Sequence, residues 1–226
     1  MEIKPVAHIY TEFAEKFGIP RQSGLAGSLR GRIIFEPEFR NQEALRGLDG
    51  FSHLWLIWEF SANRGGRQWQ PTVRPPRLGG NQHMGVFATR SPFRPNPLGL
   101  SCVELESVDL EGPDGPEIIV RGADLMDGTP IYDIKPYIKY ADSHPDAVCG
   151  YVDSLSEKRA QVVLPEELAA RVPDPAALGE VLALDPRPSY HDDPQREYGM
   201  SFSGYNVKFR VEDGQDGLVV YVLDIS

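Results

Sequence analysis

Two arginines stand among closely spaced prolines in residues 85–101, whose sequence is GVFATRSPFRPNPLGLS. The three prolines restrict the backbone of this segment, so less conformational entropy is lost when a ligand orders it. Arg90 and Arg94 carry planar guanidinium groups, which suit a phosphate, a carboxylate or the face of a purine. We expect this segment to bind a ligand; the alternative is a rigid loop whose arginines form ion pairs within the protein.

A second segment, residues 127–137, has the sequence DGTPIYDIKPY and begins with turn-forming residues. Asp133, Lys135 and Tyr137 follow at every second position, so in an extended chain they point to the same side. A carboxylate, an amine and a phenol on one face can transfer protons. The pattern fits equally well an Asp133–Lys135 ion pair beside a packed tyrosine, and the sequence leaves both interpretations open.

Two shorter segments carry weaker signals. Residues 17–22, FGIPRQ, contain Arg21 and Gln22, and a carboxamide can pair with the edge of an adenine. An ordinary N-terminal loop explains this segment equally well. Residues 185–190, DPRPSY, fit either a substrate-binding loop or a stiff linker, because proline fixes the backbone in both.

The net charge of −10 argues at first against a nucleic-acid partner, but its distribution reverses that interpretation. Residues 60–103 contain no Asp, Glu or Lys and carry +6, which leaves −16 for the remainder. Because salt screens charges beyond about 8 Å, a basic patch on an acidic protein can still bind phosphates. The alternative is a solvated basic loop. The charges of this window belong to Arg64, Arg67, Arg74, Arg77, Arg90 and Arg94.

Several common catalytic patterns are missing from the sequence. No GxGxxG follows an expected strand, and neither GxxxxGK[ST] nor GxSxG occurs. The histidines and the two cysteines show no metal-ligand spacing, so we expect no metal. No apolar run approaches the roughly 20 residues of a membrane helix, and the N-terminus is unlike a signal peptide. We therefore expect a cytoplasmic protein with no membrane partner.

The expected secondary structure is mainly β. Strands are expected at residues 33–35, 51–60, 101–108, 117–121, 159–164, 204–211 and 217–225. Turn-rich EGPDGP and EDGQDG each predict a hairpin between the strands that flank them. Helices are expected at residues 41–48, 165–172 and 175–184.

The strand expected at residues 51–60, FSHLWLIWEF, is apolar enough to be buried on both faces, with Trp55 and Trp58 in the core. Strands and helices do not alternate along the chain, which argues against a doubly wound sheet. We predict an antiparallel β domain, with a barrel as the expected form, over residues 1–165. A small unit over residues 166–226, a helical linker plus a β-hairpin, is expected to be joined to it through DPRPSYHDDP.

Five motifs together resemble one known family. In chain order they are KFGIPRQ, FSHLWLI, VRPPRLGGN, GVFATRSPFRPNPLGLS and DGTPIYDIKPYI. They resemble the TsaA-like domain of the TrmO family of tRNA (N6-threonylcarbamoyladenosine) methyltransferases, over about residues 4–150. DPRPSY and YNVKFRV resemble the small domain that follows in that family, so the resemblance covers nearly the whole chain.

The resemblance implies a mainly β fold: a single-sheet antiparallel β-barrel, not a Rossmann fold, with a small α+β C-terminal domain, acting as a homodimer. It implies S-adenosyl-L-methionine as the methyl donor. The acceptor would be N6 of threonylcarbamoyladenosine beside the anticodon of threonine tRNA. The implied donor contacts fall on Pro20, Arg21, Gln22, Phe60, Ser61, Arg90, Leu100, Asp127, Gly128, Thr129 and Pro130.

Ser61 departs from the family, which often has histidine there, so a backbone contact but no imidazole contact carries over. Methyl transfer needs alignment of donor and acceptor with water excluded, and a base near N6 would raise its nucleophilicity. The candidates for that base are Asp133, Lys135 and Tyr137. Candidates for holding anticodon-loop phosphates or the threonyl carboxylate are Arg74, Arg77 and Arg94, and for stacking on bases Trp69, Phe93 and Tyr190.

Two other functions compete with this one. A non-catalytic barrel that recognises the modified tRNA would also use the arginine-rich window. The DGTP and PRQ segments favour the enzyme, because a pure binding protein does not need a cofactor pocket. A methyltransferase for a small molecule or a different RNA is the third possibility, and the arginines favour RNA without naming it.

Overall fold

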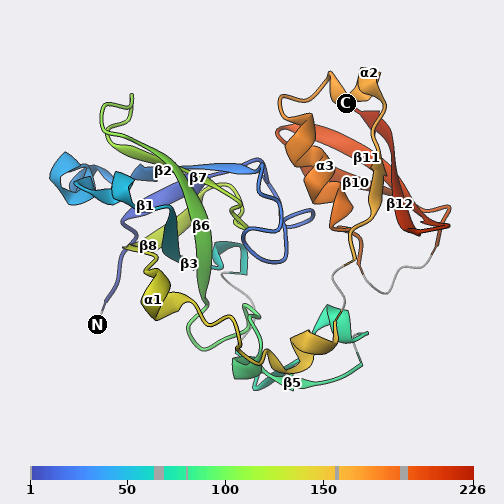
Figure 1. The fold of residues 1–226 in the computed structure, drawn as a ribbon, viewed down its shortest axis with the longest axis horizontal. Helices are drawn as coiled ribbons and strands as arrows, with labels where there is room; N and C mark the ends of the chain where they lie inside the picture. Colours follow the sequence, from blue (N-terminus) through green and yellow to red (C-terminus); the bar gives the residue numbers. More distant parts are fainter. Residues whose placement is uncertain (1, 64–68, 80, 156–157, 189–192) are drawn as a thin grey trace.

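A computed structural model describes residues 2–63, 69–79, 81–155, 158–188 and 193–226. Within them, six strands close into an antiparallel barrel with the order β1-β2-β7-β6-β3-β8, so the predicted fold class is confirmed (Figure 1). The strands are β1 (Ala7–Tyr10), β2 (Arg30–Phe35), β3 (His53–Glu59), β6 (Leu98–Asp109), β7 (Glu117–Arg121) and β8 (Thr129–Pro136).

The barrel core comes from side chains that alternate along the strands. In β3, Leu54, Leu56 and Trp58 are buried, while Trp55 and Ile57 on the other face are half-buried. The prediction that residues 51–60 are buried on both faces is therefore wrong, because the wall of a barrel has an outer surface. Trp58 lies in the core as predicted. The Trp55 indole N–H instead donates to Asp142 Oδ2 at 3.1 Å.

The C-terminal unit is a four-stranded sheet, with the order β10-β11-β12-β9, packed against two helices. The strands are β9 (Gln161–Val163), β10 (Glu197–Phe202), β11 (Tyr205–Gly214) and β12 (Gly217–Ile225), and the helices are α2 (Glu166–Ala169) and α3 (Pro175–Ala183). The predicted hairpin between β11 and β12 is confirmed. Helix α3 begins at a proline, as predicted, and the Asp174 carboxylate accepts a hydrogen bond from Ala177 N at 2.9 Å.

Two predictions about the boundary between the units are wrong. Strand β9 pairs in parallel with β12, so residues 161–163 belong to the C-terminal sheet, although the boundary at 165 places them with the barrel. The described ends of the proline-rich segment, residues 185–188 and 193–194, follow α3 and precede β10 in the chain, so this segment connects two elements of the C-terminal unit and not the two units. A strand as short as β9 is ordered by its partner, and that partner is far away in the sequence.

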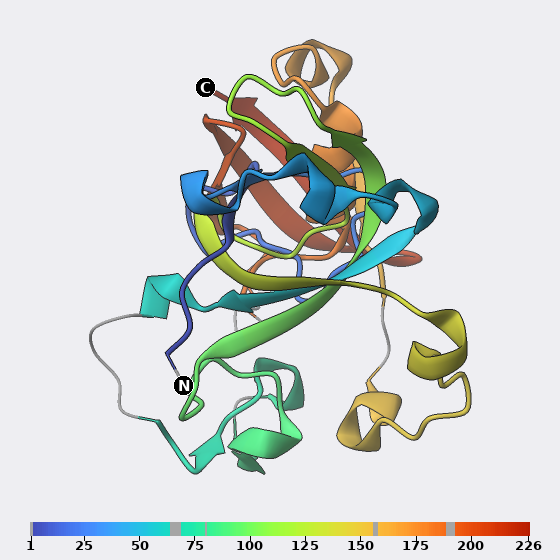
Figure 2. The same ribbon diagram turned by 90° about the vertical axis from the view of Figure 1, so that its left-hand side faces the viewer.

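The chain between β1 and β2, residues 11–29, belongs to both units. Phe13, Ala26 and Leu29 are buried in the core of the C-terminal unit, although both flanking strands belong to the barrel. The Phe13 and Phe202 rings meet edge to face with centroids 5.9 Å apart. Figure 1 shows this segment, in blue, between the barrel and the C-terminal unit, and Figure 2 shows the C-terminal sheet behind the barrel.

The remaining elements are short. A two-stranded hairpin joins β4 (Thr72–Val73) to β5 (Met84–Gly85), and α1 (Lys139–Asp142) is a single turn. The 3₁₀ turns are η1 (Pro37–Phe39), η2 (Gln42–Leu45), η3 (Leu48–Gly50), η4 (Ser61–Asn63), η5 (Pro76–Leu78), η6 (Val86–Ala88) and η7 (Gly150–Ser154). No helix in the described parts of the chain is both long and apolar enough to span a membrane.

Two predicted helices are much shorter in the structure. The one expected at residues 41–48 is the 3₁₀ turn η2, capped by Asn41, whose side chain accepts from Glu43 N at 3.0 Å. It ends because Gly47 adopts a φ of 80°, which no helix continues through. The one expected at residues 165–172 contains the single turn α2.

Candidate active site

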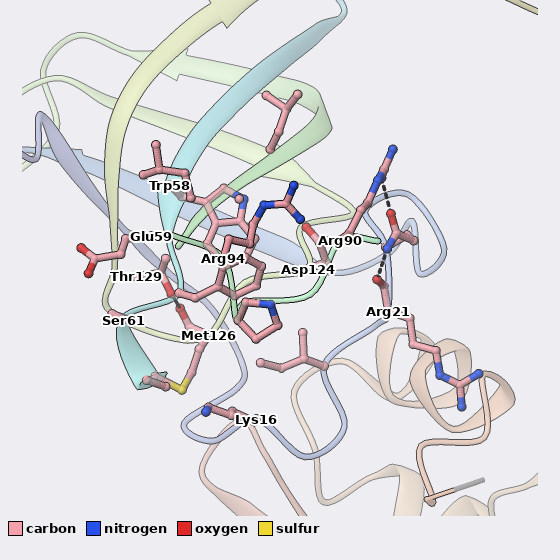
Figure 3. A pocket seen from close by; sticks show the side chains of 18 of the residues that line it. Lys16, Arg21, Trp58, Glu59, Ser61, Arg90, Arg94, Asp124, Met126 and Thr129 are labelled. Carbon is pink, nitrogen blue, oxygen red and sulfur yellow. Dashed lines mark hydrogen bonds between the residues drawn. The ribbon is translucent and has the colours of Figure 1, made fainter. Parts of the chain in front are cut away.

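A cavity of about 460 Å3 opens where β3 and the start of β6 meet the loops that carry residues 16–22 and 89–94 (Figure 3). This volume is in the range of pockets for small organic ligands. The lining residues are Lys16, Ile19, Pro20, Arg21, Gln22, Trp55, Trp58, Glu59, Phe60, Ser61, Ala62, Thr89, Arg90, Pro92, Arg94, Leu98, Gly99, Leu100, Asp124, Met126 and Thr129.

The two arginines of residues 85–101 have different hydrogen-bond partners, although both line the cavity. The Arg94 guanidinium donates to the backbone carbonyls of Val86 at 3.2 Å and Thr89 at 2.7 Å, so it holds its own loop together. Arg90 reaches across to the other loop and donates to the side-chain oxygen of Gln22. Figure 3 shows this contact as the dashed line that begins at Arg90.

An aromatic wall is built on Gly99. A Cβ atom at this position would lie 2.3 Å from Trp58 Cε2, so the indole occupies the space that any other residue's side chain would need. Phe60 packs edge to face on Trp58, with ring centroids 4.4 Å apart. Rings held in this way line the cavity with rigid apolar surface, which suits a purine.

Asp124 is a site residue that the sequence interpretation missed. The Ser101 hydroxyl donates to Asp124 Oδ1 at 2.6 Å, and the same hydroxyl accepts from the Trp58 indole N–H at 2.9 Å. Burial raises the pKa of the Asp124 carboxyl above its usual value, and hydrogen bonds from Ser101 and from backbone amides, with the charge of Arg90, oppose that rise. A carboxylate inside the apolar run ADLM was the signal in the sequence that could have found it.

Most of the expected donor contacts lie together, although they come from distant parts of the chain. Those that line the cavity are Pro20, Arg21, Gln22, Phe60, Ser61, Arg90, Leu100 and Thr129.

Asp127, Gly128 and Pro130 are not among the lining residues. The Asp127 carboxylate accepts from Thr11 N at 3.0 Å, Gly128 has a φ of 70°, and Pro130 is paired with His8 of β1. They form the turn and the first pairing of β8, which place the buried Thr129 at the cavity.

The proposed proton-transfer residues lie outside the cavity lining. Asp133 Oδ2 and Lys135 Nζ form a 2.9 Å ion pair, so the prediction that they share a face is confirmed. Ile131 and Ile134 both pack in the barrel core, because a bulge shifts the register of β8 against β3 between them. That bulge turns Asp133 and Lys135 outward. The ring of Tyr137 lies 6.0 Å from that of Trp55.

The expected tRNA contacts divide in the same way. Arg94 lines the cavity, whereas Arg74 and Arg77 both belong to the connection between β4 and β5 and are not among the lining residues. Arg74 Nε is 3.0 Å from His83 Nε2. Trp69 is 52% exposed, as a base-stacking ring must be. Tyr190, Arg64 and Arg67 lie outside the residues that the structure describes.

The cavity combines features that define a class of site. Guanidinium groups, an aromatic wall and a half-buried carboxylate meet in one cavity of a small closed barrel, and the described residues hold no cluster of His, Cys, Asp or Glu fit for a metal. The size and lining of this cavity suit a small, polar, purine-sized molecule. Comparison with known proteins gives the class a name, and the chain belongs to the TrmO family.

The match extends over both units. The model of the tRNA-methyltransferase O N-terminal domain matches residues 8–143, and that of the TrmO C-terminal domain matches residues 157–225. The chain is 41% identical over 233 residues to the tRNA (adenine(37)-N6)-methyltransferase of Escherichia coli K12, covering 99% of this chain and 97% of that protein.

Two relatives from Pseudomonas aeruginosa add to this. One has S-adenosylmethionine-dependent methyltransferase in its name and is 41% identical over 207 residues, which is 88% of this chain and 87% of that one. The crystal structure of TrmO from P. aeruginosa matches with a TM-score of 0.78 and 32% identity, covering 100% of this chain and 98% of that one.

The raised pKa of Asp124 predicts a pH-dependent change in stability. The folded protein keeps this proton to a higher pH than the unfolded chain, so ionisation removes stability as pH rises through the raised pKa. Asp124→Asn cannot ionise, and its oxygen still accepts from Ser101. The difference in free energy of unfolding between variant and wild type should therefore shift in favour of the variant as pH rises. Urea denaturation between about pH 4 and about pH 8 measures it, and a pH-independent difference would contradict the prediction.

Proposed function

We propose that this protein is an S-adenosylmethionine-dependent methyltransferase that modifies N6 of adenosine 37 in tRNA. The observation that carries the proposal is the convergence of the expected donor contacts from residues 20–22, 60–61, 90 and 100 on one cavity. The relative from Escherichia coli that carries this activity in its name matches almost the full chain. That match across both units disfavours the alternative of a non-catalytic RNA-binding barrel.

The lining suits the donor. S-adenosylmethionine supplies an electrophilic methyl group when bound. Trp58 and Phe60 form the apolar aromatic surface that we assign to its adenine, and Arg90 offers a guanidinium that we assign to its carboxylate. The prolines beside Arg90 limit its movement before binding, so orientation costs less entropy.

A proton must leave N6 when the methyl group is added, because the product nitrogen is neutral. The lone pair of N6 is delocalised into the purine, and removing the proton raises its nucleophilicity. We assign the proton acceptor to Asp124, since it lines the cavity and burial raises its pKa toward the range of a general base. Asp133, Lys135 and Tyr137 are the competing candidates from the sequence, and they lie outside the lining.

The tRNA would approach from the arginine-rich side. We assign Arg74 and Arg77 to phosphates of the anticodon loop, because both belong to residues 60–103, whose sequence carries a charge of +6. Trp69 and Phe87, which are 52% and 73% exposed, are suited to stacking on splayed bases. A carboxylate on the substrate base, as in threonylcarbamoyladenosine of threonine tRNA, would give Arg94 an anionic partner at the cavity.

The proposal includes two further features. A homodimer would cover exposed apolar side chains such as Tyr140 and Val148, which are 91% and 89% exposed. A cytoplasmic location follows from the proposed substrate, since tRNA is met there.

The direct test is methyl transfer to tRNA. Incubation of threonine tRNA carrying threonylcarbamoyladenosine with the protein and S-adenosylmethionine should add one CH2 unit to the modified adenosine, as nucleoside mass spectrometry measures. The same tRNA without the threonylcarbamoyl group is the matched control for the substrate. No mass gain on either tRNA would contradict the proposed activity, and equal gains on both would contradict the assigned substrate.

The assignment of the base predicts a difference between two carboxylates. Asp124→Asn keeps the shape of the side chain and its hydrogen bond from Ser101, and should lower kcat by about 100-fold or more. Affinity for S-adenosylmethionine should change little by comparison. Asp133→Asn tests the competing candidate in the same single-turnover assay. A large loss for Asp133→Asn together with a small one for Asp124→Asn would reverse the assignment.

The arginines should separate into two groups. Arg90→Ala should weaken S-adenosylmethionine binding roughly tenfold in calorimetry, because a charged hydrogen-bond donor is lost. Arg74→Ala or Arg77→Ala should leave that binding alone, weaken tRNA binding, and reduce the salt slope of log K by about one. If either of these last variants keeps the wild-type salt slope, that arginine does not contact a phosphate.

A further inference from the structure

Within the described parts of the chain, the C-terminal unit contributes no residue to the cavity, since all the lining residues lie before position 130. Several of them stand in the single segment between β1 and β2: Lys16, Ile19, Pro20, Arg21 and Gln22. We call residues 16–22 the donor loop. Two hydrogen bonds attach the chain to the barrel, one before and one after the donor loop. Thr11 N donates to Asp127 Oδ1 at 3.0 Å, and Gly24 N donates to Gly122 O at 2.8 Å.

On one side the C-terminal sheet fits closely against the donor loop. Gly18 has a φ of 96°, and a Cβ atom there would lie 2.2 Å from Met200 Sδ. Met200 is fully buried in the core of the C-terminal unit. Just before the loop, the backbone N–H of Ser203 donates to Glu12 O at 2.9 Å. The bare backbone at position 18 is therefore what lets the loop lie on this sheet.

Helix α3 contacts residues 11–29 near the end of that segment, at Ser28. The Glu180 carboxylate accepts from both Ser28 N at 2.9 Å and Ser28 Oγ at 2.8 Å. Arg159, which comes just before β9, donates through Nη2 to Leu25 O at 2.6 Å. The segment is thus fixed to the C-terminal unit both before and after the donor loop.

The donor loop also contacts the proline-rich segment. Arg21 Nη2 donates to Asp185 O at 3.2 Å. Asp185 has a φ of 48°, and its carboxylate accepts from Arg187 Nε with both oxygens at 3.0 Å. The Arg187 side chain is only 11% exposed, so this ion pair is well shielded and holds the strained turn in place.

We propose that the C-terminal unit is a positioning device for the methyl-donor site: it holds the donor loop against the barrel, and Gly18 and Met200 form the critical contact. The inference rests on the proposed function, since it concerns the same cavity. It assigns the unit an effect on donor binding that acts through the donor loop. Disturbing the contact should raise the KM for S-adenosylmethionine more than it lowers kcat.

Two glycines of the same segment provide the test. Gly18 and Gly24 both have positive φ, at 96° and 78°, so alanine strains the backbone at both. Only Gly18 would clash with the C-terminal unit, because nothing lies within 4 Å of a Cβ at Gly24. Gly18→Ala should raise the Kd for S-adenosylmethionine roughly tenfold over that of Gly24→Ala, measured by calorimetry on the full chain.

A rescue experiment distinguishes a loss of positioning of the donor loop from general damage to the fold. Met200→Ala removes the atoms that the new Cβ would meet, so the double variant Gly18→Ala/Met200→Ala should bind the donor better than Gly18→Ala alone. Equal affinity of Gly18→Ala and Gly24→Ala would overturn the proposal while wild-type methylation still stood. Absence of donor binding by the wild type would instead overturn the proposed function.

A second variant decides the matter if Gly18→Ala does not fold. Ser28→Ala removes one of the two hydrogen bonds to Glu180 and lies outside the cavity lining. Amide hydrogen exchange in residues 16–22 should become faster, with exchange in β3 and β6 unchanged, and the KM for the donor should rise while kcat holds. Unchanged exchange and unchanged KM would overturn the proposal.

Discussion

The Trp58 indole N–H, the Ser101 hydroxyl and the Asp124 carboxylate form one hydrogen-bond chain across three parts of the barrel wall. Trp58 belongs to β3, Ser101 to β6, and Asp124 precedes β8. In a shielded site an unmatched polar group is costly, so replacing one member by an apolar residue leaves its neighbour without a partner. Gly99 adds a steric condition, because the indole fills its side-chain space. The aromatic wall and the carboxylate of the cavity are therefore fixed together.

Residues 11–29 couple this wall to the rest of the molecule. They begin and end on barrel strands, yet Phe13 and Leu29 are buried in the core of the C-terminal unit. A segment with anchors in two cores loses most of its freedom on folding, which lowers the entropy that a ligand must later remove. The donor loop at its centre is short and has no regular secondary structure of its own, and its Phe17 and Ile19 side chains pack against the core of the C-terminal unit. Its order comes from the surfaces on either side.

Local sequence patterns predicted the features that depend only on neighbouring residues, and not those that depend on pairing between distant segments. Apolar and polar side chains alternate over residues 204–211. This pattern predicted β11 because it depends only on which face of that one strand is buried. The partner of β9 is β12, near the C-terminus, and no local pattern around Gln161 reveals it. Asp133 was placed on the correct shared face with Lys135, but the bulge that turns them outward depends on pairing with β3. Asp124 was missed because its role comes from Ser101, which is distant in the sequence.

The Arg90–Gln22 hydrogen bond joins two loops that line the cavity, and the two residues are separated by 68 positions in the chain. A single exposed hydrogen bond contributes little in water, so it cannot by itself hold the two loops at a fixed separation. Each loop must therefore be ordered by other contacts. Arg94 donates to backbone carbonyls of its own loop, and the C-terminal unit supports the donor loop. A second folded unit therefore supports the donor loop, beside a cavity that the described residues of this unit do not line.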